Sequence, residues 1–369
     1  MGAPLRAAAL LTASALTLAT CPVEAGAAPK AAGPKFKGKG SYIVVDGDTG
    51  QVLAGRNERV KYLPASTQKV LTALTLIPLL HPDDKIKATA KSCYPEGTKV
   101  GMDPKLSYKA SDLFKAMLMM SANDAAMTLT LPNGYKQTIA LMNAKAKEIG
   151  ATDTVAGSPN GLDVDLGLNL KTQHTTSFDL AIQMRAALKL PEFVQYAQTV
   201  NAKFPALSVP KKDKKTGKKT KPKIYQMPIY SHIRLLPTES QEYKGFIAGK
   251  NGYTNAAQQT FVGAAKRNGH TIIVALMKAE TLWSNASALF DWGFANDGKV
   301  TPIGNLPDES APGKAAMSAA LPPAVPAGKT SGGGTDRSDD YLLGGIGLAF
   351  ILAGVGVLLF RRKRPTSSS

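Results

Sequence analysis

Short apolar runs rich in β-branched residues, bounded by turns, stand at both ends of the central region of the chain, and helical spacing dominates between them. Residues 41–45 and 51–56 predict two strands joined by a turn at 46–50. Asn268-Gly269, a pair typical of a tight hairpin turn, separates two of the later strands. The later β-rich runs predict three strands in all, over residues 246–250, 260–265 and 271–277.

Apolar residues at helical spacing fill the stretch between these strands. They predict helices over residues 66–76, 111–120, 135–149, 175–188 and 282–294. Pro78 and Gly150 stand where the first and third of these helices are expected to end. Strands at both ends with helices between them predict an α+β fold, in which an antiparallel sheet is flanked by helices and a helical subdomain is added.

The first residues have the pattern of a secretory signal. Residues 1–27 combine a short basic start, an uncharged apolar run and a small-x-small cleavage site, which predicts a signal peptide. A lipoprotein signal ending at Cys21 is the alternative, although Thr20 fits it poorly. Residues 28–40 are rich in Ala, Gly, Pro and Lys and are expected to be disordered.

The last part of the chain has the pattern of a linker and a membrane anchor. Residues 301–340 hold six prolines and a Gly-Gly-Gly run, which predicts a linker. Residues 341–360 carry no charge and, as a helix, would span a hydrocarbon core of about 30 Å. The cations that open residues 361–369 predict a cytoplasmic tail. The sequence therefore predicts a single-pass protein of the cell membrane, whose folded domain, residues 41–300, is extracellular.

The net charge narrows the choice of partners. The whole chain carries +18, and about +14 remains outside the membrane once the signal and the four cations of the tail are removed. Such an excess favours polyanions. For an extracellular domain these would be anionic wall polymers or lipid head groups rather than nucleic acid. Simple solubility in a crowded or salty wall explains the charge equally well.

Cysteine and histidine indicate no metal or cofactor. After signal cleavage only Cys93 remains, so neither an internal disulfide nor a cysteine metal site is expected. The four histidines are scattered and lack the spacing of metal ligands. Asp163 and Asp165 have the setting of a loop rather than of a glycosidase pair.

Ser66-Thr67-Gln68-Lys69 is the first motif that carries chemistry. A spacing of three places Ser66 and Lys69 on one helix face, close enough to touch. A serine hydroxyl needs an adjacent base, and a lysine can serve if desolvation or a neighbouring cation lowers its pKa. Alone, the motif is also compatible with an ordinary helix start and an exposed lysine. Residues 208–211 repeat the letters, but Pro210 opposes a helix there.

The second motif is Ser121-Ala122-Asn123, which follows an apolar run. A hydroxyl and a carboxamide two residues apart can both project into a cleft from a loop between helices. The hydroxyl can relay a proton, and the carboxamide can bind a peptide carbonyl. By letters alone, residues 158–160 match as well.

The third motif is the segment from Lys250 to Thr254 on a late strand, with the sequence Lys-Asn-Gly-Tyr-Thr. A cation there can bind a substrate carboxylate and keep the pKa of Lys69 low. Gly252 permits another backbone to approach closely. Residues 215–217 spell the commoner Lys-Thr-Gly, but they lie within residues 211–223, which hold eight lysines and are interpreted as a solvated basic loop.

The three motifs in this order are the pattern of penicillin-binding proteins and serine β-lactamases. Over residues 41–296 the chain resembles the low-molecular-mass D-alanyl-D-alanine carboxypeptidases, the penicillin-binding peptidase family. The matching segments are residues 64–69, 121–126, 158–162 and 249–257. The resemblance implies a penicillin-binding, β-lactamase-like transpeptidase fold without a cofactor. It also implies peptidoglycan stem peptides as substrates and β-lactam antibiotics as covalent inhibitors.

The resemblance also implies a role for each site residue. Ser66 would attack the penultimate D-Ala carbonyl, and Lys69 would take its proton. Ser121 would share in proton transfer to the leaving D-Ala, and Asn123 would hold the substrate backbone. The backbone N–H groups of Ser66 and Tyr253 would form the oxyanion hole. Lys250 would bind the terminal carboxylate within a substrate-binding segment made of Lys250, Asn251, Gly252, Tyr253 and Thr254.

Two departures from the family pattern leave alternatives open. Asn251 stands where the family usually has threonine or serine, and no all-β domain is evident between Asn296 and the predicted anchor. A non-catalytic or weakly active wall-binding protein of the same fold is one alternative. A D,D-endopeptidase or transpeptidase is another, because sequence does not tell whether water or an amine accepts the acyl group. A β-lactamase is disfavoured, since no Glu-based deacylation motif is evident.

Overall fold

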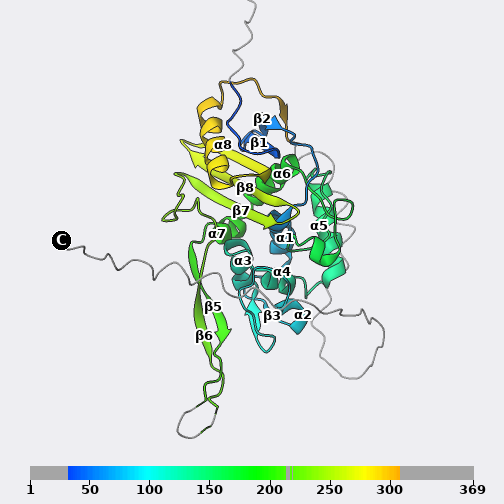
Figure 1. Ribbon diagram of the computed structural model, residues 1–369, viewed down its shortest axis with the longest axis vertical. Helices are drawn as coiled ribbons and strands as arrows, with labels where there is room; N and C mark the ends of the chain where they lie inside the picture. The colour runs from blue at the N-terminus through cyan, green and yellow to red at the C-terminus, as the bar shows by residue number, and fades with distance from the viewer. Residues whose placement is uncertain (1–31, 213–216, 218, 308–369) are drawn as a thin grey trace, which may run out of the picture. The chain divides into compact units, whose positions relative to one another are not determined.

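A six-stranded antiparallel sheet forms the centre of the molecule (Figure 1). The computed structural model describes residues 32–307 apart from 213–216 and 218. The strand order is β10-β2-β1-β9-β8-β7. The strands are β1 (Ser41–Asp46), β2 (Gln51–Arg56), β7 (Phe246–Thr254), β8 (Gln258–Arg267), β9 (His270–Ala279) and β10 (Gly304–Asn305). Because β1 pairs with β9, both ends of the described chain build one sheet, as the sequence predicted.

The sheet is buried on both faces at its centre. Ile43, Val45 and Ile273 pack into the larger hydrophobic cluster, whereas Val44 and Ile272 pack into a second one. This division follows from the strand, in which successive side chains point to opposite faces. The helix α8 (Trp283–Asn296) packs on the second face, and α1 (Gln68–Leu76) and α6 (Ser177–Ala187) pack on the first.

A helical region continues the larger cluster away from the sheet. Leu71, Phe114 and Met142 are buried there on three different helices. The five helices predicted from the sequence begin and end within two residues of their predicted positions, which confirms that part of the prediction.

The remaining elements are α2 (Ala90–Cys93), α3 (Ala110–Met119), α4 (Asn123–Leu129), α5 (Tyr135–Glu148), α7 (Pro191–Ala197), the 3-10 helices η1 (Ala65–Thr67), η2 (Ile77–Leu79) and η3 (Val164–Leu166), and the short strands β3 (Lys85–Lys87) and β4 (Ser107–Lys109).

A two-stranded hairpin was not predicted. It consists of β5 (Asn201–Leu207) and β6 (Ile224–Tyr230). The described residues within 211–223, a stretch interpreted as a solvated basic loop, lie at its far end. Pro205 and Pro228 argue against strands in the sequence, because proline has no backbone N–H to donate to the hydrogen bonds of a sheet. A hairpin of only two strands tolerates them, since each strand has a free edge.

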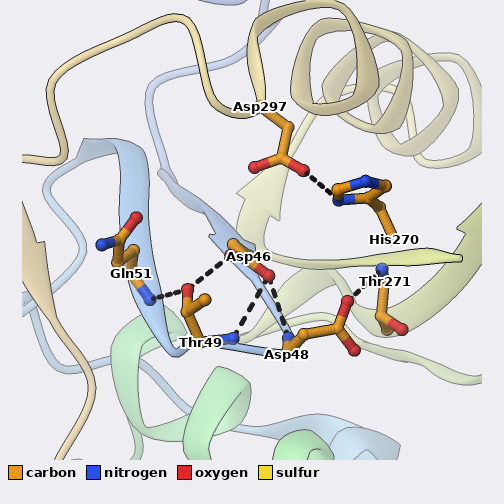
Figure 2. Close-up of polar contacts among 7 residues, drawn as sticks. All are labelled: Asp46, Asp48, Thr49, Gln51, His270, Thr271 and Asp297. Atoms are coloured by element: carbon orange, nitrogen blue, oxygen red, sulfur yellow. Dashed lines mark hydrogen bonds and ion pairs between the residues drawn. The ribbon is translucent and has the colours of Figure 1, made fainter.

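The turn between β1 and β2 is anchored to the beginning of β9. Figure 2 shows the Asp46 carboxylate accepting from the backbone N–H of Asp48 at 2.9 Å. The Asp48 carboxylate in turn accepts from the N–H of Thr271 at 2.8 Å. His270 lies 3.1 Å from the carboxylate of Asp297, just after α8. These acidic side chains therefore tie the turn after β1 and the end of α8 to the start of β9, at one end of the central strands.

Some predicted end segments need correction, and others lie outside the described residues. The prediction of disorder is wrong for residues 32–40, because Lys37 and Asn285 exchange two hydrogen bonds of 2.8 Å. The predicted linker likewise begins with the strand β10, which pairs with β2. Within residues 32–307, leaving out the two gaps, no helix is long and apolar enough to cross a membrane. The predicted signal, anchor and tail, residues 1–27, 341–360 and 361–369, lie outside the described residues.

Candidate active site

Ser66 is the middle residue of η1, which leads directly into α1. The spacing of three predicted contact with Lys69, and the Lys69 Nζ lies 2.8 Å from the Ser66 Oγ. The preceding residue, Ala65, has a left-handed backbone with φ of 48°. The Pro64 carbonyl accepts hydrogen bonds from the hydroxyls of Thr67 at 2.6 Å and Thr260 at 3.0 Å. These contacts fix the unusual turn that presents Ser66 to its lysine.

Lys69 is fully buried, and its amine contacts three oxygen atoms. Besides the Ser66 Oγ, these are the Asn123 Oδ1 at 2.7 Å and the Asn160 backbone carbonyl at 2.8 Å. Burial, and secondly the charge of Lys250, hold the pKa of Lys69 well below its ordinary value. A neutral amine can accept a proton, so the arrangement suits a general base.

Ser121 and Asn123 lie where α3 ends and α4 begins. Ser121 is buried and has a left-handed backbone with φ of 65°. Asn123 opens α4, and its Nδ2 donates to the Glu96 carbonyl at 2.7 Å. With its Oδ1 on Lys69 and its Nδ2 on Glu96, the carboxamide is held in one orientation. The next residue, Asp124, accepts from three backbone N–H groups of the segment that follows Glu96, those of Val100, Gly101 and Met102.

The segment 158–162 closes the site from a third direction. The Asn160 carbonyl binds Lys69, while its side chain accepts from the N–H of Leu162 at 3.0 Å. Gly161 has φ of 83°, and a Cβ there would overlap the Ala65 carbonyl. The sequence matched this segment to the family without a role. A backbone carbonyl leaves no side-chain signal by which its contact could have been found.

The strand β7 brings the third motif against Ser66. Lys250 is fully buried, its Nζ donates to the Asn251 carbonyl at 2.7 Å, and burial lowers its pKa to about 7. The Asn251 Oδ1 lies 3.3 Å from the same nitrogen. A Cβ at Gly252 would stand 2.6 Å from the Ser66 backbone nitrogen. Only glycine lets β7 approach η1 this closely, as the sequence indicated.

The last two residues of the motif differ in their surroundings. Tyr253 is 59% exposed. Thr254 donates to the Asp163 Oδ2 at 2.6 Å, which ties β7 to the loop after Gly161. The sequence had placed Asp163 in a loop, without a partner. Its buried carboxylate is thus a supporting residue of the site that sequence reasoning missed.

The alternative match to the first motif belongs to the hairpin. Ser208 bonds with Lys223 across the two chains of the hairpin, so residues 208–211 do not start a helix. Residues 215–217 fall largely outside the described residues. The three motifs that form the site are therefore residues 66–69, 121–123 and 250–254.

The comparison with known protein families agrees with this geometry. The family model of the D-alanyl-D-alanine carboxypeptidases matches residues 29–281. The chain belongs to this family. The prediction of a serine peptidase of the penicillin-binding type is thereby confirmed.

Individual relatives extend the comparison. A D-alanyl-D-alanine carboxypeptidase of Mycobacterium tuberculosis is 39% identical over 76% of this chain and 89% of its own. A crystal structure of a D-alanyl-D-alanine carboxypeptidase from Mycobacterium tuberculosis superposes on the chain with a TM-score of 0.64 at 38% identity. The superposition covers 76% of this chain and 98% of that one. An Escherichia coli D-alanyl-D-alanine endopeptidase is 28% identical over 72% of this chain and 79% of its own. A Streptomyces DD-transpeptidase mutant shares the fold, with a TM-score of 0.61 at 22% identity over 71% of this chain and 99% of that one.

Proposed function

We propose that this chain is a serine-type D-alanyl-D-alanine carboxypeptidase that trims peptidoglycan stem peptides through an acyl-enzyme on Ser66. The observation that carries the proposal is the buried Lys69 amine, 2.8 Å from the Ser66 Oγ and with a lowered pKa. A neutral amine has two hydrogens and one lone pair. When the hydrogens go to Asn123 and Asn160, the lone pair is left for the hydroxyl of Ser66.

Acylation then follows from the positions of these groups. The Ser66 Oγ bonds to the penultimate D-Ala carbonyl carbon while its proton passes to Lys69. The carbonyl oxygen gains charge between the N–H groups of Ser66 and Tyr253, which serve as the oxyanion hole. As the C–N bond breaks, Ser121 relays the proton to the nitrogen of the leaving D-Ala. Water releases the shortened peptide and restores Ser66.

Lys250 is proposed to select a substrate with a free carboxyl end. Its ammonium lies next to Asn251 on the strand that adjoins Ser66. A carboxylate bound there keeps Lys250 charged, because an opposite charge favours the ionised form. Asn251 supplies a carboxamide hydrogen to the same carboxylate, and Asn123 holds the substrate backbone. β-Lactam antibiotics, which also carry a carboxylate, would acylate Ser66 in the same geometry.

Carboxypeptidase activity is favoured over the alternatives by two observations. The intact contacts of Ser66, Lys69 and Asn123 oppose a protein that only binds the wall. The relative with 39% identity is described as a carboxypeptidase, whereas the endopeptidase is 28% identical. We therefore assign carboxypeptidase activity, in which water accepts the acyl group.

The same proposal includes a place in the cell. A signal peptide over residues 1–27 and an anchor over 341–360 would leave the catalytic domain extracellular, with residues 361–369 in the cytoplasm. This topology brings the enzyme to its substrate, because peptidoglycan lies outside the cell membrane.

Mass spectrometry of the protein after incubation with penicillin tests the proposal. We expect one adduct on Ser66, and Ser66→Ala should lose both the adduct and release of D-Ala from a diacyl-D-Ala-D-Ala peptide. Ser208→Ala is the matched control, since Ser208 begins the other S-x-x-K match, and it should behave as the parent. Undiminished D-Ala release by Ser66→Ala would reject the assignment.

A further inference from the structure

The far end of the β5–β6 hairpin is an ordered ladder beyond the two strands. The Ser208 N–H donates to the Lys223 carbonyl at 2.9 Å, and the Thr220 N–H donates to the Lys211 carbonyl at 2.8 Å. Lys212 and Lys219 form a further bridge. Figure 1 shows the hairpin as a two-stranded arm. We call its end, residues 207–212 and 219–225, the arm tip.

The arm concentrates positive charge. Residues 201–230 hold nine lysines and one acidic residue, so they contribute +8 of the net +18. Lys212 faces Lys219 across the ladder, although like charges in that position destabilise a sheet. The described lysines of the arm tip are exposed and form no ion pair with another described residue: Lys211, Lys212, Lys219, Lys221 and Lys223. Their charges are available to an external anion.

Apolar side chains are exposed beside these lysines. Val209 is 81% exposed, Ile224 63% and Tyr225 47%. The base of the arm is different, because Phe204 is buried there and stacks on Tyr108 with ring centroids 5.2 Å apart. The fold therefore covers Phe204, although Tyr230 at the base is 62% exposed, and it leaves the apolar residues of the tip to solvent.

We propose that the arm tip docks onto the surface of a membrane that contains anionic phospholipids. The lysines would lie near the lipid phosphates, and Val209, Ile224 and Tyr225 would enter the head-group region. Exposed apolar residues among lysines favour lipid over a hydrated wall polymer, because burial of apolar surface adds to charge attraction only at a lipid interface. This site is separate from Ser66 and its partners.

An environment-sensitive fluorophore on the arm tip tests the docking. The full chain with Cys21→Ser and Val209→Cys is labelled at residue 209, since the remaining native Cys93 is buried. It is placed in vesicles of phosphatidylcholine, with or without phosphatidylglycerol. We expect a blue shift only with phosphatidylglycerol, and its loss at high salt. The same label at Ile303→Cys, an exposed residue beside β10, should not respond.

Charge and apolar contributions are separated by variants. Each lysine near an anionic surface strengthens binding about fivefold, so changing Lys211, Lys212, Lys219 and Lys221 to glutamine should abolish the blue shift. The matched control changes four exposed lysines elsewhere to glutamine, Lys136, Lys171, Lys266 and Lys278, and should keep it. Penicillin acylation serves as the folding check and should be unchanged in both.

The outcomes separate docking on lipid from binding to a soluble anionic polymer. Ile224→Ser should weaken the blue shift in phosphatidylglycerol vesicles while the lysines are intact. No blue shift in those vesicles would overturn the proposal. A shift that depends on the lysines but not on Ile224, and that soluble polyphosphate also produces, would reassign the arm tip to an anionic polymer.

Discussion

Lys69 and Lys250 are both fully buried, and the charge of Lys250 adds to burial in lowering the pKa of Lys69. The proposed chemistry needs opposite protonation states in the two residues. Lys69 must be neutral to accept a proton, whereas Lys250 must be charged to hold a carboxylate. Burial and the charge of Lys250 hold the pKa of Lys69 well below its ordinary value, which favours the neutral amine. Burial lowers the pKa of Lys250 to about 7, and a substrate carboxylate bound beside it favours the charged form.

Lys250→Gln is expected to move the rising limb of the pH profile of acylation to higher pH. Removing a nearby positive charge raises the pKa of Lys69, so its amine stays protonated to a higher pH. The measurement is the acylation rate by a fluorescent penicillin across pH. Lys266→Gln, at an exposed lysine of β8, should leave the profile in place. An unmoved limb in Lys250→Gln would contradict coupling between the two lysines.

Gly252→Ala is expected to slow acylation about a hundredfold, the typical effect of losing one oxyanion-hole donor. The new Cβ would stand 2.6 Å from the Ser66 nitrogen and 2.5 Å from the Thr260 Oγ1, so one of the two backbones must shift. Gly304→Ala in β10 is the control, because no atom lies within 4 Å of its Cβ. Acylation at the parental rate by a folded Gly252→Ala protein would show that the Ser66 N–H is not used.

Thr254→Val is expected to lower the free energy of unfolding by about 1–3 kcal/mol, the cost of leaving a buried acceptor unsatisfied. The Asp163 carboxylate is buried and accepts from the Thr254 hydroxyl at 2.6 Å. Urea unfolding of the parent and the variant measures the difference. Thr254→Ser keeps a hydroxyl and should recover most of the loss. Equal stability of the valine variant would show that the contact is not formed in solution.

Asn251→Asp is expected to raise KM for a D-Ala-D-Ala peptide about tenfold or more, since a hydrogen bond to a charged group contributes about 1.5–3 kcal/mol. The new carboxylate would occupy Lys250 and repel that of the substrate. Steady-state release of D-Ala gives KM and kcat separately. Asn251→Thr retains a donor and should keep KM near the parental value. A parental KM in the aspartate variant would place the substrate carboxylate elsewhere.

Local patterns were sufficient for much of the fold. The strands and helices that carry clear periodicity lie where they were predicted, and Asn268 and Gly269 both have the positive φ that a tight turn requires. The contact of Ser66 with Lys69 was also predictable, because three residues of helix-like chain fix the distance between two side chains. Where proline interrupts the pattern, as in β5 and β6, the prediction failed.

The sequence by itself determined the family, the order of the three motifs and the pair Ser66 and Lys69, all of which depend on residue type and short spacing. Only the tertiary structure decided that the Asn160 carbonyl holds Lys69, that Asp163 binds Thr254, and that residues 32–40 pack against α8. These contacts join residues far apart in the chain. Their geometry depends on how the sheet and helices pack, which no local pattern encodes.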